Sequence, residues 1–514
     1  MWANQFMGLV LTAVMAGTIV PTIVPTIVPT MVPAMTPGDI LFQAKSRYSD
    51  GQSKEFEKEF RFSESFFQNS GYTYNHELAK SSLGLAVSAF SSLSSENDYG
   101  AAQNVNREIN IANAYKMLGF GGVRYYAYDE SLNDNASKAA FSLAHRKITV
   151  NGEPYTLVAA VLRGGGYGAE AGDNFLVGGG AHHEGLNAAA QKVLTKLSGY
   201  IQELNAGGQV KIWITGYSRA AGAVNILAAS LDKSNAGLWR PENVYAYTFA
   251  APQTVVRRSA AHPGGVETDA ALFGNIFNIL NPTDAVPYMP LSEWGFARYG
   301  VTYYFPFSSA SDYNGKVASE YRALTNGSYS PAAAAALGQR IRSLEETLMR
   351  LYPTQSDYVK QLQPVFTGLF ALVNMKNMDA EGKWTQKDYL ANFLDLYGEE
   401  GQKRYNAAKF LITLEEAARA KTKLGKPLEL EAREFVTLLM AFCGVNGLSA
   451  AEIKRIAAAA LDYFRDTGPN AVVLGLNLKN STLRQAHFPE IYIAWMAALN
   501  QAGQFETEPG EILN

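Results

Sequence analysis

The sequence predicts an α/β protein with a mostly parallel sheet, followed by a long insertion made only of helices. Three observations carry this prediction. A short apolar run at 210–217 passes through a sharp turn at Ser218 into a stretch of small, helix-forming residues. Apolar runs and helical patterns then alternate to about residue 305, which is typical of parallel sheets. From 312 to 467 only helical patterns remain.

Length and composition exclude several classes of protein. With 514 residues, of which 47% are hydrophobic, the chain can bury a large core, either as one domain with insertions or as two domains. The net charge is −3 and no Lys/Arg block forms a basic patch, so nucleic-acid binding is not expected. The single cysteine, Cys443, excludes an intrachain disulfide and a cysteine-ligated metal, and its apolar surroundings favour a core position.

The first 37 residues form a separate segment. An apolar run at 6–16 has the length of a signal-peptide core, although no Lys or Arg precedes it. A four-residue Val-Pro-Thr-Ile repeat at 20–33 follows, and its regular prolines favour an extended chain over a membrane-spanning helix. We expect a secretory leader with a spacer, and hence a secreted or cell-envelope protein. A disordered apolar tail or a misassigned start, with a cytoplasmic location, is the alternative.

The first part of the core is expected at 38–310. Helical spacing of apolar residues at 75–92 and 105–118 predicts two helices, and 122–128 reads as a strand. Two further apolar runs, at 146–150 and 155–162, flank Asn151-Gly152, a strong hairpin signal. The sheet should therefore open with antiparallel strands, after which 186–204 forms a helix.

A glycine-rich loop follows the second hairpin strand, from Arg163 to Phe175. Its glycines allow close backbone approach and expose N–H groups, as an oxyanion site requires, although a flexible surface loop is the plainer interpretation. Nucleotide binding is disfavoured because no Gly-Lys-Ser/Thr follows. The pair His182-His183 could suggest a metal, but neighbouring residues cannot both face one ion from a regular element, so packing or hydrogen bonding is favoured.

The turn at Ser218 is typical of a nucleophile elbow, in which a strained strand-to-helix turn lifts a serine hydroxyl clear of the sheet. The positions two residues to either side must then be small, and they are Gly216 and Ala220. On this stretch alone, an ordinary buried serine after a core strand is an equally good interpretation.

Two later apolar runs, at 244–252 and 276–287, predict further parallel strands, and 300–306 another. Asp284 lies just past the carboxyl end of one of them, at the edge where such sheets build active sites. An insertion at 311–468 should be all-helical, with helices opening at 330–331 and 385–388 and a capping box at 449–452. The chain returns to the core at 469–514, with His487 in a turn followed by a short amphipathic helix.

Only one of the six histidines, His487, is C-terminal to Asp284. A serine at an elbow, an acid after a strand and a late histidine follow the chain order of α/β-hydrolase triads. With several further motifs in the same order, the sequence resembles the class 3 lipase family, in its larger bacterial form. The resemblance covers roughly 75–305 and 480–500, and the segments that carry it are 163–168, 183–185, 216–225, 247–252, 278–287 and 486–492.

The resemblance implies an α/β-hydrolase core with Ser218 as nucleophile, Asp284 as orienting acid and His487 as base. It also implies oxyanion N–H donors at Gly165 and Arg219, no metal or organic cofactor, and a small-molecule or lipid ester as substrate, with possible contact to a lipid interface. Gly165 stands where many members of the family have threonine, and Ala220 where glycine is usual. A thioesterase or peptidase with the same triad, and a non-catalytic binding protein on this fold, remain as alternatives. The insertion is expected to cap the site.

Overall fold

A computed structural model describes residues 38–47, 55–90, 108–128, 139–164, 173–207, 209–233, 237–307, 312–330, 345–346, 348–350, 352–361, 363 and 486–508. Its centre is a seven-stranded sheet with the strand order β11-β9-β7-β6-β5-β4-β3. The strands are β3 Gly121–Tyr126, β4 Phe141–Val150, β5 Glu153–Leu162, β6 Val210–Tyr217, β7 Val244–Phe249, β9 Ile276–Leu280 and β11 Val301–Tyr304. Strands β5, β6, β7, β9 and β11 are parallel, which confirms the predicted α/β core with a mostly parallel sheet.

The hairpin at the start of the sheet forms where the sequence predicts it. β4 pairs antiparallel with β5 through Asn151-Gly152, whose φ values of 52° and 84° are those of a two-residue hairpin turn. β3 also pairs antiparallel with β4, so the antiparallel strands occupy one side of the sheet. The carboxyl ends of β5, β6, β7 and β9 consequently meet at one edge.

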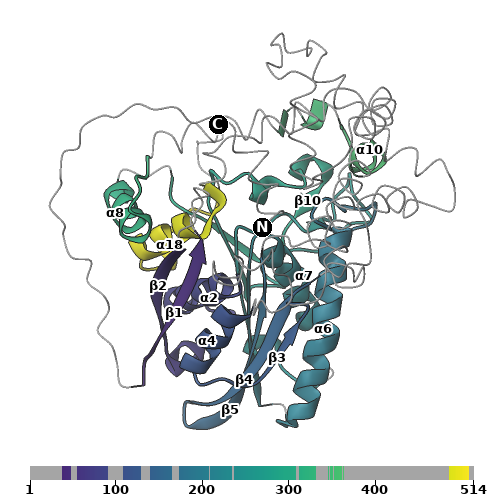
Figure 1. Cartoon of the computed structure of the whole chain (residues 1–514). Helices are drawn as coiled ribbons and strands as arrows, with labels where there is room; N and C mark the ends of the chain where they lie inside the picture. Colours follow the sequence, from purple (N-terminus) through teal and green to yellow (C-terminus); the bar gives the residue numbers. More distant parts are fainter. Residues whose placement is uncertain are drawn as a thin grey trace, which may run out of the picture.

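Alternate residues of the central strands enter two separate cores. Leu157, Ala159 and Trp213 belong to one hydrophobic cluster, whereas Val158 and Ile212, one position along, belong to the other. Helices cover both faces, with α2 and α4 on one side and α6 and α7 on the other (Figure 1). They are α2 His76–Ser88, α4 Ile109–Met117, α6 Glu184–Leu204 and α7 Arg219–Lys233. The sheet is thus the middle of three layers, as βαβ connections require.

An antiparallel hairpin that the sequence analysis did not foresee precedes the first helix. It consists of β1 Ile40–Arg47 and β2 Glu55–Phe62 and packs against α2 and α4. Alternate aromatic side chains of β2, including Phe56, Phe60 and Phe62, are buried, and the charged residues between them lie largely toward solvent. A second small sheet pairs β8 Val255–Val256 with β10 Phe296–Ala297.

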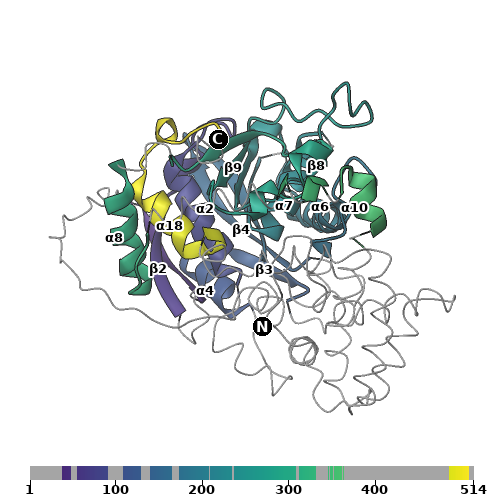
Figure 2. The same cartoon turned by 90° about the horizontal axis from the view of Figure 1, so that it is seen from above.

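Among the described residues of the C-terminal part, the further helices are α8 Asn314–Thr325, α10 Gln355–Gln361 and α18 Pro489–Ala498. Short 3₁₀ turns are η1 Glu64–Phe67, η3 Pro241–Asn243, η4 Val286–Tyr288, η5 Ser292–Trp294 and η8 Ala502–Gln504. The expectation of an amphipathic helix after His487 is wrong. Every residue of α18 except Ala497 is buried, because α8 and α2 pack against it (Figure 2).

Several expectations fall outside the described residues. These are the leader and repeat at 1–37, the helix starts at 331, 385–388 and 449–452, Cys443, and Gly165 in the glycine-rich loop. Most of the insertion at 311–468 is also outside, so its role as a cap stays a prediction. In the described part of the chain, no helix is both long enough and apolar enough to cross a membrane.

Candidate active site

The turn between β6 and α7 has the geometry of an elbow. Ser218 adopts φ of 59°, a conformation that costs a non-glycine residue energy and that surrounding structure must hold in place. Its backbone N–H donates to the carbonyl of Phe249 at 2.8 Å, and its own carbonyl accepts from the N–H of Gly222 at 3.2 Å. A Cβ at Gly216 would lie 2.8 Å from the backbone of Ala220, so the turn admits only glycine there. The methyl group of Ala220 is accommodated.

Three side chains from distant parts of the chain meet at this turn. Ser218 Oγ lies 2.8 Å from His487 Nε2, and His487 Nδ1 lies 2.8 Å from Asp284 Oδ2. An ionised carboxylate can only accept hydrogen bonds, so the imidazole proton belongs on Nδ1. Nε2 is then free of a proton and accepts the hydroxyl hydrogen of Ser218. The sequence-predicted residues are therefore brought together in the order serine, histidine, acid.

Asp284 is completely buried, and protein donors compensate for its loss of water. Besides His487, the hydroxyl of Tyr492 donates to Oδ2 at 2.9 Å and the N–H of Val286 donates to Oδ1 at 2.9 Å. Burial, and secondarily the negative charge of Asp284, raises the pKa of Tyr492 well above its usual value. Tyr492 therefore keeps its proton and remains a donor to the carboxylate.

The backbone around His487 is fixed by two side chains that the sequence analysis did not assign. The hydroxyl of Tyr217, the residue before Ser218, donates to the carbonyl of His487 at 2.7 Å. Asn281 Nδ2 donates to the carbonyl of Ala486 at 2.8 Å. Tyr217 is the last residue of β6, and Asn281 directly follows β9. The late segment that carries the histidine is thus attached to the same sheet edge that carries the serine and the acid.

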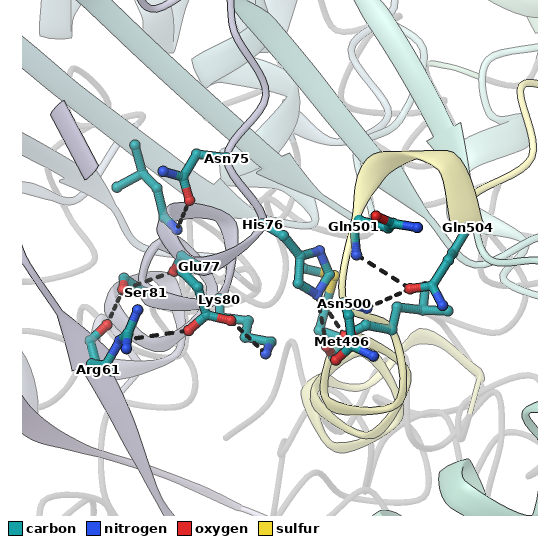
Figure 3. Close-up of polar contacts among 12 residues, drawn as sticks. Arg61, Asn75, His76, Glu77, Lys80, Ser81, Met496, Asn500, Gln501 and Gln504 are labelled. Carbon is teal, nitrogen blue, oxygen red and sulfur yellow. Dashed lines mark hydrogen bonds and ion pairs between the residues drawn. The ribbon is translucent and has the colours of Figure 1, made fainter. Parts of the chain in front are cut away.

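The far end of α18 is anchored to α2 by His76. Its Nε2 lies 3.1 Å from the carbonyl of Met496 and 2.9 Å from that of Leu499, so the ring donates a hydrogen bond from Nε2 to these carbonyls (Figure 3). Nδ1 lies 3.0 Å from the hydroxyl of Tyr74, which donates to it. Burial lowers the pKa of His76 to about 4, which keeps the ring neutral near pH 7. The helix that supplies Tyr492 is therefore held at its C-terminus.

One of the two expected oxyanion donors lies in the described part. Arg219 is the first residue of α7, and backbone N–H groups in a first turn lie at the positive end of the helix dipole. The loop of the other donor, Gly165, starts after Gly164, where an added Cβ would lie 2.5 Å from the carbonyl oxygen of Tyr217. Gly164 thus brings the start of that loop against the residue before the elbow serine.

The adjacent residues His182 and His183 make hydrogen bonds within the fold. His183 precedes α6 and accepts a hydrogen bond from the N–H of Leu186, while His182 lies 3.1 Å from the hydroxyl of Tyr299. Burial lowers the pKa of His183 to about 4. These contacts are the packing and hydrogen bonding that the sequence favours for the pair. Across the residues that the structure describes, no group of three or more His, Cys, Asp or Glu side chains could hold a metal ion.

Comparison with known proteins gives one family. The family described as Lipase (class 3) matches residues 162–294, a segment that contains Ser218, Arg219 and Asp284 and ends before His487. None of the curated proteins compared with the sequence matches it.

Several solved structures are similar to the chain. Rhizomucor miehei triacylglyceride lipase is 17% identical, covering 45% of this chain and 80% of that one, with a TM-score of 0.30. Lipase II from Rhizopus niveus is 15% identical, over 44% and 79%, with a TM-score of 0.29. A lipase from Rhizopus microsporus var. chinensis is 15% identical, over 44% and 73%, with a TM-score of 0.28.

Proposed function

We propose that the chain is a serine hydrolase of the lipase type, which cleaves lipid esters with Ser218, His487 and Asp284; the match of residues 162–294 to the family described as Lipase (class 3) supports this proposal. The observation that carries this proposal is the unbroken hydrogen-bond chain from Ser218 Oγ through both ring nitrogens of His487 to Asp284 Oδ2. A nucleophile, its base and an orienting acid need this connection and this order.

Each step of the proposed reaction is assigned to a named residue. His487 Nε2 takes the Ser218 proton as Oγ attacks the ester carbonyl, and the ring becomes an imidazolium beside the buried carboxylate of Asp284. The backbone N–H groups of Arg219 and Gly165 stabilise the oxyanion of the tetrahedral intermediate. The imidazolium then protonates the leaving alcohol, and an acyl-Ser218 remains. Water, deprotonated by His487, attacks the acyl group and releases the acid and free enzyme.

The magnitudes expected for these contributions are large. Loss of the acid costs on the order of 10⁴ in rate in related triads, because the histidine loses its correct tautomer and its charge stabilisation. Loss of one oxyanion donor costs on the order of 10²–10³. Proton transfer and hydrogen bonding account for every step, so the proposal invokes no metal ion or organic cofactor.

We take an acylglycerol-like or other lipid ester, presented in part at a lipid interface, as the substrate. The family supports esters of this kind, whereas the geometry of the triad would also serve a thioester or a peptide. A non-catalytic role on the same fold is disfavoured because all three triad positions are occupied and connected by hydrogen bonds, which packing alone does not require.

The test is hydrolysis of a p-nitrophenyl ester series of increasing chain length, with a thioester and a peptide anilide in parallel. We expect ester turnover by the wild type and none by Ser218→Ala, whose unfolding temperature should stay near that of the wild type because a half-buried hydroxyl contributes little packing. Turnover that survives in Ser218→Ala would remove this residue from the nucleophile's role. Preference for the thioester or anilide would transfer the proposal to those reactions.

The insertion and the N-terminal segment complete the proposal. We propose that 311–468 caps the active site, because its two ends adjoin β11 and His487, both at the catalytic edge. A Gly/Ser linker in place of 364–468 should then change chain-length preference, and identical kinetics across the series would contradict a cap. We also propose secretion through the 1–37 segment, which N-terminal sequencing of protein recovered from the medium or envelope would test.

A further inference from the structure

Arg219 has a buried side chain with an opposite charge beside it. The residue directly follows Ser218 and begins α7. Its guanidinium Nη2 lies 3.5 Å from Asp173 Oδ2, and the two side chains are only 3% and 9% exposed. A charge at this depth is costly unless it is paired, so each of the two side chains constrains the position of the other.

Asp173 belongs to a segment that is fixed to the start of α6. A Cβ on Gly185 would lie 2.2 Å from the carbonyl oxygen of Asp173, so the two backbones touch. His183 Nε2 lies 3.2 Å from the carbonyl of Asn174 and donates to it, and the N–H of Gly185 donates to the carbonyl of Leu176 at 2.9 Å. The ion pair therefore links the first residue of α7 to a rigid support and not to a freely moving loop.

This link has a counterpart at the other end of the glycine-rich loop. Gly164 packs its backbone against the carbonyl of Tyr217, and Asp173 pairs with the side chain of Arg219. The residues between 164 and 173 include Gly165, to which the proposed function assigns an oxyanion donor. Both ends of this loop are thus attached to the two residues that flank Ser218, and Arg219 itself is the second donor in that proposal.

We propose that the Arg219–Asp173 ion pair is a positioning device for the oxyanion donor on Arg219. By holding the Arg219 side chain against the α6 support, the pair fixes where the Arg219 N–H lies relative to Ser218 Oγ. Arg219 and Asp173 act as positioning residues, since their side chains need not touch the substrate. The inference rests on the proposed function, because an oxyanion exists only if Ser218 attacks a carbonyl.

The alternative role for the pair is stability alone, and a charge-neutral double variant separates the two. Arg219→Met and Asp173→Asn should each lower the unfolding temperature, because each leaves one buried charge without its partner. Arg219→Met/Asp173→Asn removes both charges and should unfold near the wild-type temperature. If the pair only stabilises the fold, activity must return in the double variant. If the pair positions the donor, activity must stay low although the fold is restored.

Two readouts measure the oxyanion directly. We expect kcat for the best p-nitrophenyl ester to fall about 10- to 100-fold in the double variant, with KM changed by less than about twofold, since a donor misplaced by a fraction of an ångström acts on the transition state. An alkyl trifluoromethyl ketone, which forms an oxyanion adduct with a serine, should lose affinity by the same factor. The matching methyl ketone, which forms far less adduct, should bind almost unchanged.

A matched control is the ion pair of Arg146 with Glu64 at 2.7 Å, which joins β4 to η1 away from the triad. Arg146→Met/Glu64→Gln should leave kcat and ketone affinity at wild-type values. If the first double variant does not fold, Arg219→Lys/Asp173→Glu keeps both charges but changes their reach, and it should also lower kcat and ketone affinity together. Wild-type kcat and ketone affinity in whichever double variant folds would overturn the proposal.

The outcome also distinguishes this proposal from the proposed function. Ester turnover that persists in Ser218→Ala, or a wild type insensitive to the trifluoromethyl ketone, would reject the proposed function and the positioning role with it. A wild type that is active and ketone-sensitive, an inactive Ser218→Ala and a fully active neutral double variant would reject the positioning role alone.

Discussion

At the scale of single residues, the surroundings of Asp284 account for the orientation of the histidine. The carboxylate accepts from His487, from Tyr492 and from the backbone of Val286. Tyr492 has a second contact, because its oxygen also accepts from the N–H of Asn281 at 3.0 Å. One hydroxyl thus connects the acid to the backbone at the end of β9, and it restrains the acid against rotation away from the histidine.

Tyr492→Phe tests this contact. The variant keeps the ring, which packs against Tyr217 and Phe305, but leaves Asp284 and the Asn281 N–H each without one hydrogen bond. We expect kcat to fall about 10-fold, the equivalent of one hydrogen bond, with KM nearly unchanged. Tyr247→Phe is the matched control, because its hydroxyl accepts from the N–H of Asn75 and touches no triad residue. Equal effects of the two substitutions on kcat would contradict a role in positioning the acid.

The sequence predicts the three triad positions but not what holds them. Ser218, Asp284 and His487 are identifiable because each lies at a turn after a strand or before a helix, in a fixed chain order. Tyr492 and Tyr217 lie inside motifs that the sequence analysis singled out, yet an aromatic residue in an apolar run is typical of a core. Only the helical turn of α18, which directs Tyr492 toward the end of β9, shows that its hydroxyl meets a carboxylate.

At the scale of elements, residues 352–361 and 363 of the insertion, which include α10, are attached to the core beside α6. Gln355 Nε2 donates to the carbonyl of Gly178 at 2.7 Å, and the N–H of Gly178 donates to Gln363 Oε1 at 2.9 Å. Tyr358 donates to the carbonyl of Phe175 at 3.1 Å, and Trp294 donates to that of Tyr352 at 2.9 Å. The segment 173–180 therefore lies between α6, which supports it from the core, and α10.

Gln355→Ala/Gln363→Ala should loosen this segment. Three hydrogen bonds to the backbone of Gly178 and Gly180 are lost. At about 1 kcal/mol each, the amides of 173–180 should lose roughly 3 kcal/mol of protection against hydrogen exchange. Glu320→Gln, which weakens the Lys58–Glu320 ion pair on α8, is the control and should leave these amides unchanged. Unaltered exchange at 173–180 in Gln355→Ala/Gln363→Ala would show that α10 does not support the segment.

The elements themselves were predictable to different degrees. The strands β3 to β7, β9 and β11 and the helices between them follow from apolar periodicity and from the Asn151-Gly152 turn, whereas the short strands β8 and β10 were not predicted. The β1–β2 hairpin was missed, although β2 alternates charged and aromatic residues and the turn signal Asp50-Gly51 lies between the two strands. The wrong expectation for α18 has a tertiary cause: α8, which lies far from it in sequence, covers the face left for solvent.

At the scale of the whole molecule, two buried histidines couple folding to pH. Burial lowers the pKa values of His76 and His183 from 6.5 to about 4, so the folded state keeps both rings neutral where the unfolded chain would protonate them. The unfolded state then binds more protons between pH 6.5 and 4, and stability falls as pH falls through that window. Each histidine should remove on the order of 3 kcal/mol by pH 4.

Urea unfolding of the wild type and of His76→Gln at pH 7 and pH 4.5 checks this account. Asp232, whose pKa burial raises to about 6, acts in the opposite direction and is the same in both proteins, so the difference between them isolates His76. The variant should be less stable at pH 7, because it lacks the rigid ring that accepts from Tyr74 and donates to α18 at the same time, but its stability should depend less on pH. Parallel pH dependences for the two proteins would contradict a neutral buried His76.

The elbow, the sheet edge and the late C-terminal segment all converge on Ser218 Oγ, to which the proposed function assigns the role of nucleophile. The most direct measurement is peptide mass mapping after treatment with an alkyl fluorophosphonate. We predict one phosphonyl adduct, on Ser218, formed in parallel with loss of ester hydrolysis, and formed at least about 1,000-fold more slowly in His487→Ala. An adduct on another residue, or full ester hydrolysis by protein modified on Ser218, would contradict the triad.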